Sequence, residues 1–352
     1  MTAVSESVGV GTSADSDLVL EVTDLQVRFG GRRAQKPIRA IDGLSFTMAS
    51  GETVGVIGES GSGKSTMGRA VLGLTTPTSG SIRVGGDDLW ARRGDDRRRL
   101  RRRVQGIFQD PHEALDPRMT VAQSITEPLR RGVGMSKAAA DLRAVELLEM
   151  VGLGAFHLGR RPHELSGGQK QRVNIARALT LNPELIVCDE IVSALDVSIQ
   201  ADILNLLADI QSERSVSYLF ISHDLAVVSY LADRVIVMYL GIIVEEAAID
   251  TLIADPRHPY TRALVAAQSL PLPPSLRPAV PPPLQGDIPS PADPPSGCRF
   301  RTRCPYAQPI CAEQVPATVL VGDRHTAACH FTTEIATGEL ARTDLPNPTA
   351  LS

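Results

Sequence analysis

The chain has 352 residues, enough for two or three domains of about 100–200 residues each. Lys plus Arg number 36 and Asp plus Glu number 40, so the formal net charge is −4, which excludes a basic chain that coats nucleic acid through bulk charge. The longest apolar run, Val235–Val244, is far shorter than the ~18 residues of a membrane-spanning helix, so we expect no span. The N-terminal region lacks the pattern of a secretory signal or transit peptide, and the odd count of 5 cysteines indicates reduced thiols in the cytosol.

The chain begins with a small, polar, acidic stretch over residues 1–17, which predicts a disordered tail. Apolar alternation then predicts strands over Leu18–Val22, Leu25–Phe29 and Leu44–Met48. Thr53–Ile57 is short, apolar and rich in β-branched residues, which is typical of a buried parallel strand.

A glycine-rich loop follows that strand directly. Gly58–Ser65 has the P-loop pattern of Gly, four residues and Gly-Lys-Ser, between a predicted strand and a helix predicted from Lys64. The glycines let backbone N–H groups crowd around phosphate oxygens, and the helix N-terminus favours an anion. We expect Lys64 to reach the β- and γ-phosphates and the Ser65 hydroxyl to bind Mg²⁺; a glycine/serine turn that binds nothing is the alternative.

The next region combines an arginine run with a long helical pattern. Arg92–Arg103 holds eight arginines and two aspartates, which we interpret as a solvated helix rather than a nucleic-acid surface, because no aromatic residues interleave the charges. Val104–Phe108 is a buried-strand candidate, and Thr120–Ala178 is predicted to be mostly helical.

Two adjacent carboxylates follow a second buried-strand candidate. Leu185–Val187 is apolar and leads through Cys188, which we expect only to fill the core, into Asp189 and Glu190, the form of a Walker B strand. Asp189 would enter the Mg²⁺ shell and Glu190 would orient or deprotonate the attacking water. A solvated strand end is the alternative reading of such a pair.

Helical and strand patterns continue to alternate after this point. A helix is predicted over Ile199–Ile210, and strands over Ser217–Ile221, which ends at Ser222-His223-Asp224, and over Arg234–Tyr239. Strands separated by helical stretches favour an α/β layer with a mainly parallel sheet, into which the helical block is inserted as a subdomain.

The C-terminal part changes character. Ser269–Ser296 has 11 prolines in 28 positions, which predicts a stiff linker. Behind it, cysteines follow the pattern Cys298-x5-Cys304-x6-Cys311-x17-Cys329. Four thiolates can hold Zn²⁺ or an iron–sulfur cluster; no close Cys pair of the zinc type is present, and the wide spacing suits a larger object. Four unrelated thiols are the remaining alternative.

Leu165-Ser166-Gly167-Gly168-Gln169 resembles the signature of ABC-type ATPases and lies about 20 residues before the Walker B strand, as in that family. By the same resemblance Gln109 is the Q-loop glutamine, Ser193–Asp196 the D-loop and His223 the switch histidine. Phe29 either stacks on adenine or belongs to the core. Ile191 departs from the family, many of whose members have Pro there; this removes no catalytic group but could alter the D-loop backbone.

Further stretches resemble the ATPase subunits of bacterial oligopeptide and dipeptide ABC importers: Phe108-Gln-Asp-Pro111, Leu115–Met119, Leu195–Ser198, Met238–Gly241 and His258–Ala263. The resemblance covers roughly residues 18–331. It implies a peripheral protein at the cytoplasmic face of the cell membrane, with a second ATPase subunit (identical or a paralogue), two transmembrane permeases and an extracytoplasmic substrate-binding protein reached through them. It also implies a [4Fe–4S] cluster on the four C-terminal cysteines, with zinc as the alternative. A soluble ABC ATPase acting on nucleic acid or ribosomes, and a cluster-bearing regulatory protein without transport, are the competing functions.

The fold implied is α/β: an ABC-type P-loop domain with a RecA-like parallel-sheet core, an antiparallel β subdomain and a helical subdomain, followed by a small Cys-rich domain. The expected division is a tail over 1–17, the ABC domain over 18–268 with its helical subdomain at about 112–180, a Pro-rich linker over 269–296, a Cys-rich domain over 297–335 and a tail over 336–352. The implied catalytic residues are Lys64, Gln109, Glu190 and His223, and the implied Mg²⁺ ligands are Ser65, Gln109 and Asp189. The implied ATP-binding residues are Phe29, Gly58, Ser60, Gly61, Ser62, Gly63, Lys64, Ser65, Thr66, Ser166, Gly167, Gly168, Gln169 and Asp196.

Overall fold

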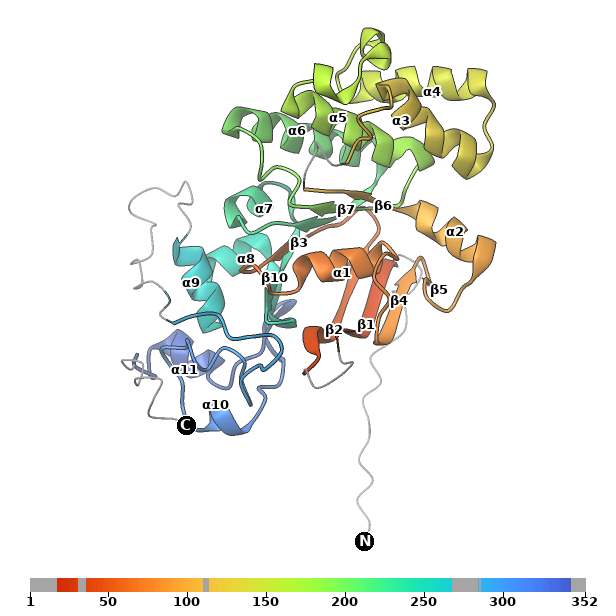
Figure 1. Ribbon diagram of the computed structural model, residues 1–352. Coiled ribbons are helices and arrows are strands. Elements are labelled where there is room, and N and C mark those ends of the chain that lie inside the picture. The colour runs from red at the N-terminus through yellow and green to blue at the C-terminus, as the bar shows by residue number, and fades with distance from the viewer. Residues whose placement is uncertain (1–17, 31–35, 110–113, 268–283, 285, 343–352) are drawn as a thin grey trace.

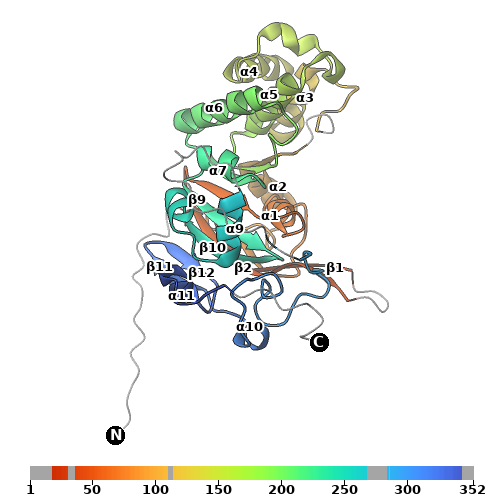
Figure 2. The same ribbon diagram turned by 90° about the vertical axis from the view of Figure 1, so that its left-hand side faces the viewer.

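The computed structural model describes residues 18–30, 36–109, 114–267, 284 and 286–342. The expected tail over 1–17, most of the expected linker over 269–296 and the last ten residues lie outside this part. Three tiers stack along the long axis of the molecule: a helical layer, a large sheet with its flanking helices, and a tier holding the small sheet and the C-terminal segment (Figures 1 and 2).

The smaller sheet is antiparallel and has four strands in the order β2-β1-β4-β5. Leu18–Phe29 forms one long strand, β1, and not the two strands expected. Asp24 has a positive φ of 45° and its N–H donates to Ser45 Oγ at 2.8 Å, so the chain bulges there and continues instead of turning. The other strands are β2 (Ile38–Ala49), β4 (Ser79–Val84) and β5 (Asp87–Asp88).

The larger sheet has eight strands in the order β11-β12-β10-β9-β3-β8-β7-β6. The five strands from β9 to β6 are parallel, and β10, β12 and β11 extend the sheet in antiparallel fashion. Their bounds are β3 Thr53–Ile57, β6 Val104–Ile107, β7 Leu185–Asp189, β8 Ser217–Ile221, β9 Arg234–Tyr239, β10 Ile242–Ala248, β11 Val319–Gly322 and β12 His325–Ala327.

The helices cover this sheet and build the layer above it. α3, α4 and α5 lie between β6 and β7 in sequence and form the helical layer together with α6 (Figure 1). The helices are α1 Lys64–Val71, α2 Gly94–Arg103, α3 Val121–Glu127, α4 Lys137–Met150, α5 Gly167–Ala178, α6 Val197–Arg214, α7 Leu225–Leu231, α8 Ile249–Ala254, α9 Pro259–Ala267, α10 Ile310–Glu313 and α11 Thr332–Thr337. α11 thus runs into the stretch expected to be a tail. Within the described part of the chain, every helix is too short or too polar to span a bilayer.

The arginine run forms α2 and its side chains lie mostly at the surface. Leu100 is the buried residue of this helix. Arg103 binds both carboxylate oxygens of Glu184 at 2.7 and 2.6 Å, and Arg97 lies 4.0 Å over the ring of Trp90. The geometry is that of a solvated helix held by Arg97 within it and by Arg103 at its C-terminal end.

The cysteine-bearing segment is joined to the large sheet. β12 pairs with β10 in the register Glu245↔Ala327 and Glu246↔Thr326, so the segment completes the edge of the large sheet. An edge strand such as β10 presents unpaired backbone groups, and the C-terminal hairpin of β11 and β12 satisfies them. The sequence did not predict this pairing, because β12 has only three residues and so shows no alternation of apolar and polar side chains.

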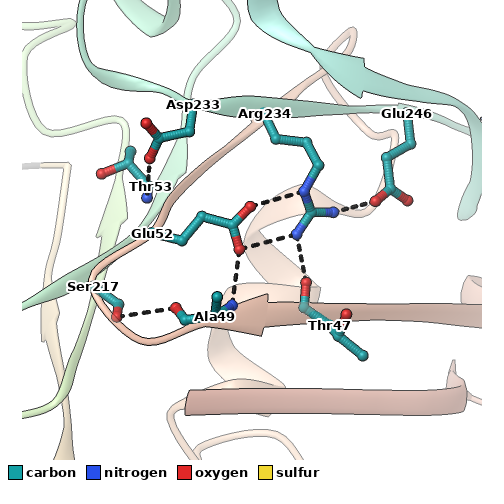
Figure 3. A network of polar contacts seen from close by, with 8 residues as sticks. All are labelled: Thr47, Ala49, Glu52, Thr53, Ser217, Asp233, Arg234 and Glu246. Carbon is teal, nitrogen blue, oxygen red and sulfur yellow. Dashed lines mark hydrogen bonds and ion pairs between the residues drawn. The ribbon is translucent and has the colours of Figure 1, made fainter. Parts of the chain in front are cut away.

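A partly buried arginine, whose side chain is 15% exposed, ties the two sheets together (Figure 3). Arg234 on β9 donates from Nε to Glu52 at 2.9 Å and from Nη2 to the Thr47 carbonyl of β2 at 2.5 Å, and it contacts the Glu246 carboxylate of β10. Burial raises the pKa of Glu246, and the adjacent guanidinium opposes that rise. The network fixes the small sheet, which carries Phe29, relative to the strands that carry the P-loop.

Candidate active site

Four neighbouring parallel strands deliver the predicted site residues to one edge of the sheet. The strands lie in the order β3-β8-β7-β6. Gly58 follows β3 and His223 follows β8. Asp189 ends β7 and Glu190 follows it, and Gln109 follows β6. Residues far apart in sequence therefore meet, because carboxyl ends of parallel strands share one edge.

The P-loop glycines are required by close contacts. Gly58 has a φ of 152°, and a Cβ there would lie 2.3 Å from the Met238 carbonyl oxygen of β9. Gly63, with a φ of 103°, would place a Cβ 2.4 Å from the carbonyl oxygen of Ala40 in β2. No side chain fits at either position, so the loop is pressed between the two sheets.

Lys64 points back into the loop. Its ammonium donates to the carbonyl oxygens of Gly58 at 2.7 Å and Glu59 at 3.0 Å, and it lies 3.4 Å from Ser62 Oγ. Burial lowers the pKa of Lys64, while the nearby carboxylates of Glu190 and Asp189 oppose that change. The positive charge is thus held inside the loop, where backbone N–H groups would meet phosphate.

Ser65 and Asp189 meet across 124 positions of sequence. Ser65 Oγ donates to Asp189 Oδ1 at 2.9 Å. Burial raises the pKa of Asp189, the Ser65 hydrogen bond lowers it, and the charge of Glu190 raises it further. A hydroxyl and a carboxylate side by side are oxygen ligands of the kind that Mg²⁺ takes together with substrate phosphates, so the pair fits that ion.

Glu190 contacts His223. The Nδ1 of His223 lies 3.4 Å from Glu190 Oε2, and the Glu190 N–H donates to the Ile221 carbonyl at 2.9 Å. Glu190 has a positive φ of 51°, and its own carbonyl accepts from Ser193 Oγ at 2.9 Å. This turn directs the carboxylate out of the strand end, so the solvated-strand alternative does not describe it; its side chain is only 19% exposed.

Phe29 and Gln109 lie at the ends of their strands. Phe29 ends β1 and is 45% exposed, so the core alternative is wrong and adenine stacking stays a prediction. Gln109 is exposed two residues beyond β6.

The signature residues lie in the helical layer, away from the P-loop. Ser166 caps α5: its Oγ accepts from the Gln169 N–H at 3.2 Å, and its own N–H donates to Gln169 Oε1 at 3.0 Å. Asp196 precedes α6 and is exposed. Among the described residues no hydrogen bond joins Leu165–Gln169 to Gly58–Thr66, and Figure 1 shows α5 and α1 in different tiers.

Comparison with known proteins decides the family. Residues 41–193 match the ABC transporter family and residues 244–311 match the oligopeptide/dipeptide transporter C-terminal region. The chain is 47% identical over 331 residues to the probable peptide ABC transporter ATP-binding protein y4tS of Sinorhizobium fredii, covering 93% of each chain. It is 47% identical to the oligopeptide transport ATP-binding protein OppF of Salmonella typhimurium, covering 89% of this chain and 96% of that one.

The chain belongs to the ATP-binding subunits of peptide ABC transporters. The expected membership of this family and the expected ATPase activity are therefore confirmed. Among solved structures, a dimeric post-hydrolysis ATP-binding cassette with ADP and Pi is similar at a TM-score of 0.58 and 29% identity, over 65% of this chain and 98% of that one. The cassette cbiO1 of Clostridium perfringens is similar at 0.60 and 27%, over 68% and 92%.

In this ABC subunit the four C-terminal cysteines converge. Cys298, Cys304, Cys311 and Cys329 all line one small pocket between α9 and the C-terminal segment. Burial raises the pKa of Cys304 and brings that of Cys329 to about 12, and neighbouring thiols add to both shifts. No group of three or more His, Cys, Asp or Glu side chains in the described residues could hold a metal ion, so the metal prediction gains no direct support. Cys188 is fully buried in β7, as a core residue would be.

Three residues of the ABC subunit had no role predicted from the sequence: Glu59, which lies within the P-loop, and Tyr260 and Arg303, which contact it. Glu59 occupies a variable position of the P-loop pattern. Tyr260 lies in the stretch His258–Ala263, which was noted only for its resemblance. Arg303 directly precedes Cys304, and this position next to a predicted ligand is the sequence feature that could have indicated a role for it.

Proposed function

We propose that this chain hydrolyses ATP to drive peptide import through a membrane permease. One observation supports the proposal above the others: Lys64, the Ser65–Asp189 pair and the Glu190–His223 pair meet at one edge of the sheet. The peptide substrate class rests on relatives named for peptide and oligopeptide transport over nearly the whole chain.

The proposed mechanism assigns a role to each group. The P-loop N–H groups and Lys64 bind the phosphates and offset the charge that develops in the transition state. Mg²⁺, with Ser65, Asp189 and Gln109 as its protein ligands, would neutralise charge between the phosphates. Glu190 accepts the proton of the attacking water, and His223 holds the Glu190 carboxylate and reaches toward the γ-phosphate.

The complete site is proposed to need two subunits. Ser166, Gly167, Gly168 and Gln169 present a helix N-terminus with no P-loop beside it in their own chain, so they are available to the nucleotide of a second subunit. The second subunit is this same chain or a paralogue. Bound MgATP would then join the two subunits head to tail.

A groove of about 510 Å³ beside β6 is the proposed docking place for a permease loop. Phe108 and Leu74 line it and are 37% and 53% exposed, and Asn174 and Arg177 of α5 form its helical wall. Gln109 follows Phe108 directly, so a nucleotide-driven shift of this segment would reach the groove. Two permeases and an external binding protein complete the proposed assembly, at the cytoplasmic face of the membrane.

The function is tested by ATP hydrolysis in liposomes that contain the chain, its partner ATPase and the permeases. We expect the rate to rise several-fold when peptide-loaded binding protein is added outside and to stay unchanged with RNA or ribosomes. Stimulation by RNA or ribosomes and not by peptide would favour the competing soluble ATPase.

We further propose that the four C-terminal cysteines hold a [4Fe–4S] cluster. Their convergence on one pocket supports the assignment, and their wide spacing in sequence, without a close Cys pair of the zinc type, favours a cluster over zinc. Residues 297–335 would then form a cluster-bearing unit after the linker at 269–296.

Anaerobically purified protein is expected to be brown and to hold about four irons per chain, as a Cys-ligated [4Fe–4S] centre requires. Cys304→Ser and Cys311→Ser should bleach it, whereas Cys188→Ser should keep its colour and iron. One zinc and no iron would support the alternative, and neither metal would return the cysteines to unrelated thiols.

A further inference from the structure

An arginine of the cysteine-bearing segment reaches into the P-loop. Arg303 donates from Nη1 to Glu59 Oε2 at 2.6 Å and from Nη2 to Glu59 Oε1 at 3.0 Å. Glu59 is the second residue of the Gly58–Ser65 loop, 244 positions away. The side chain of Arg303 is only 6% exposed and that of Glu59 is 26% exposed, so the arginine end of this two-pronged pair is buried and the carboxylate end is partly open to water.

The same loop residue is held through its backbone. The Glu59 N–H donates to the Tyr260 hydroxyl at 2.8 Å, and the Glu59 carbonyl accepts from Lys64 Nζ at 3.0 Å. One residue therefore links the C-terminal part of the chain to the ammonium expected to bind phosphate.

Buried aromatic rings pack beside Arg303. Its Nη1 lies 3.5 Å from the Tyr239 hydroxyl, and the rings of Tyr239, Tyr260 and Phe300 pack together with centroids 4.8–5.5 Å apart. Fully buried aromatic rings in mutual contact allow little local adjustment, so a displacement of Arg303 would be passed to Glu59.

Arg303 is also covalently joined to the thiol pocket, because it directly precedes the buried Cys304. Cys298 N–H donates to the carbonyl of Cys311 in α10 at 2.8 Å, so two segments of the pocket wall are joined to each other as well. Arg303 is therefore the single residue that connects the buried thiol of Cys304 to Glu59 of the P-loop.

We infer that Arg303 is a positioning residue of the nucleotide site, through which the order of the cysteine-bearing segment sets the affinity for MgATP. The inference rests on the proposed nucleotide site. By linkage the effect is reciprocal: nucleotide binding stabilises the segment by the same factor by which the segment favours nucleotide.

The decisive experiment measures the Kd of a fluorescent ATP analogue with Mg²⁺ on the purified full chain. We expect Arg303→Met and Glu59→Gln each to weaken binding about 5- to 20-fold, within the usual range of coupling between sites. Arg303→Lys keeps the charge but loses the fork and should weaken binding less than Arg303→Met. If Arg303→Met fails to fold, Arg303→Lys is the variant whose Kd tests the inference.

A matched control is the Lys36–Asp293 pair. It also joins an early segment, just before β2, to a late one, just before the cysteines, at 2.7 Å, but its side chains are 71% and 75% exposed. Asp293→Asn should therefore leave the Kd unchanged. A combined Glu59→Gln/Arg303→Met chain should bind no worse than the weaker single variant, because both changes remove one interaction.

Hydrogen–deuterium exchange supplies a second readout. MgATP should slow exchange at residues 298–304 in the wild-type chain, and this effect should be smaller in Arg303→Lys, in proportion to its loss of MgATP affinity. A wild-type Kd in folded Arg303→Lys and Glu59→Gln would overturn the inference while leaving the proposed function standing. A wild-type chain that binds no nucleotide would overturn the proposed function and this inference with it.

Discussion

Glu190→Gln is expected to bind MgATP nearly as the wild type does and to hydrolyse it about 100- to 10,000-fold more slowly. The amide keeps the size of the side chain but cannot accept the proton of the attacking water, and a positioned general base contributes a factor of that order. The 3.4 Å contact with His223 can persist with an amide oxygen, so the site geometry should survive. Single-turnover hydrolysis and nucleotide titration separate the two effects.

Because the product is not formed, the Glu190→Gln chain should accumulate as a nucleotide-joined pair of subunits, seen by light scattering with MgATP. Glu213→Gln, at an exposed position of α6, is the control and should turn over normally. Normal steady-state turnover by Glu190→Gln would contradict the role assigned to this residue.

Lys64→Ala is expected to weaken MgATP binding at least tenfold and to reduce turnover at least 100-fold. The ammonium lies inside the loop on the Gly58 and Glu59 carbonyls, and its removal takes away the charge that stabilises phosphate in both the ground state and the transition state. The measurement is nucleotide titration followed by a steady-state assay at saturating MgATP.

The control for this substitution is Lys137→Ala, because Lys137 is exposed at the start of α4. Thermal unfolding of both variants shows whether Lys64→Ala is folded. Unchanged MgATP affinity in folded Lys64→Ala protein would refute the placement of the phosphates at this loop.

The strands and loops that carry the site could be predicted from the sequence because their signals are local. Thr53–Ile57 and Ser217–Ile221 are short buried runs, and each has the predicted bounds in the structure. Their parallel pairing follows from the alternation with helices, and with it the meeting of Lys64, Asp189 and Glu190.

The features that the sequence could not predict depend on contacts between distant segments. One bulged residue, Asp24, decides that β1 is a single strand. The three-residue strand β12 joins the large sheet only because β10 offers a free edge. The sequence around Arg234 and Arg303 does not show what either residue contacts. The fold shows that Arg234 connects the two sheets and that Arg303 binds Glu59 of the P-loop.

The central claim, that this chain powers peptide import by ATP hydrolysis, is tested most directly by uptake of a labelled peptide into liposomes that carry the full assembly with ATP inside. The account predicts uptake that needs internal MgATP and falls to background when the ATPase subunit carries Glu190→Gln. Uptake that proceeds equally with the Glu190→Gln subunit, or none with the wild-type subunit in a complete assembly, would contradict it.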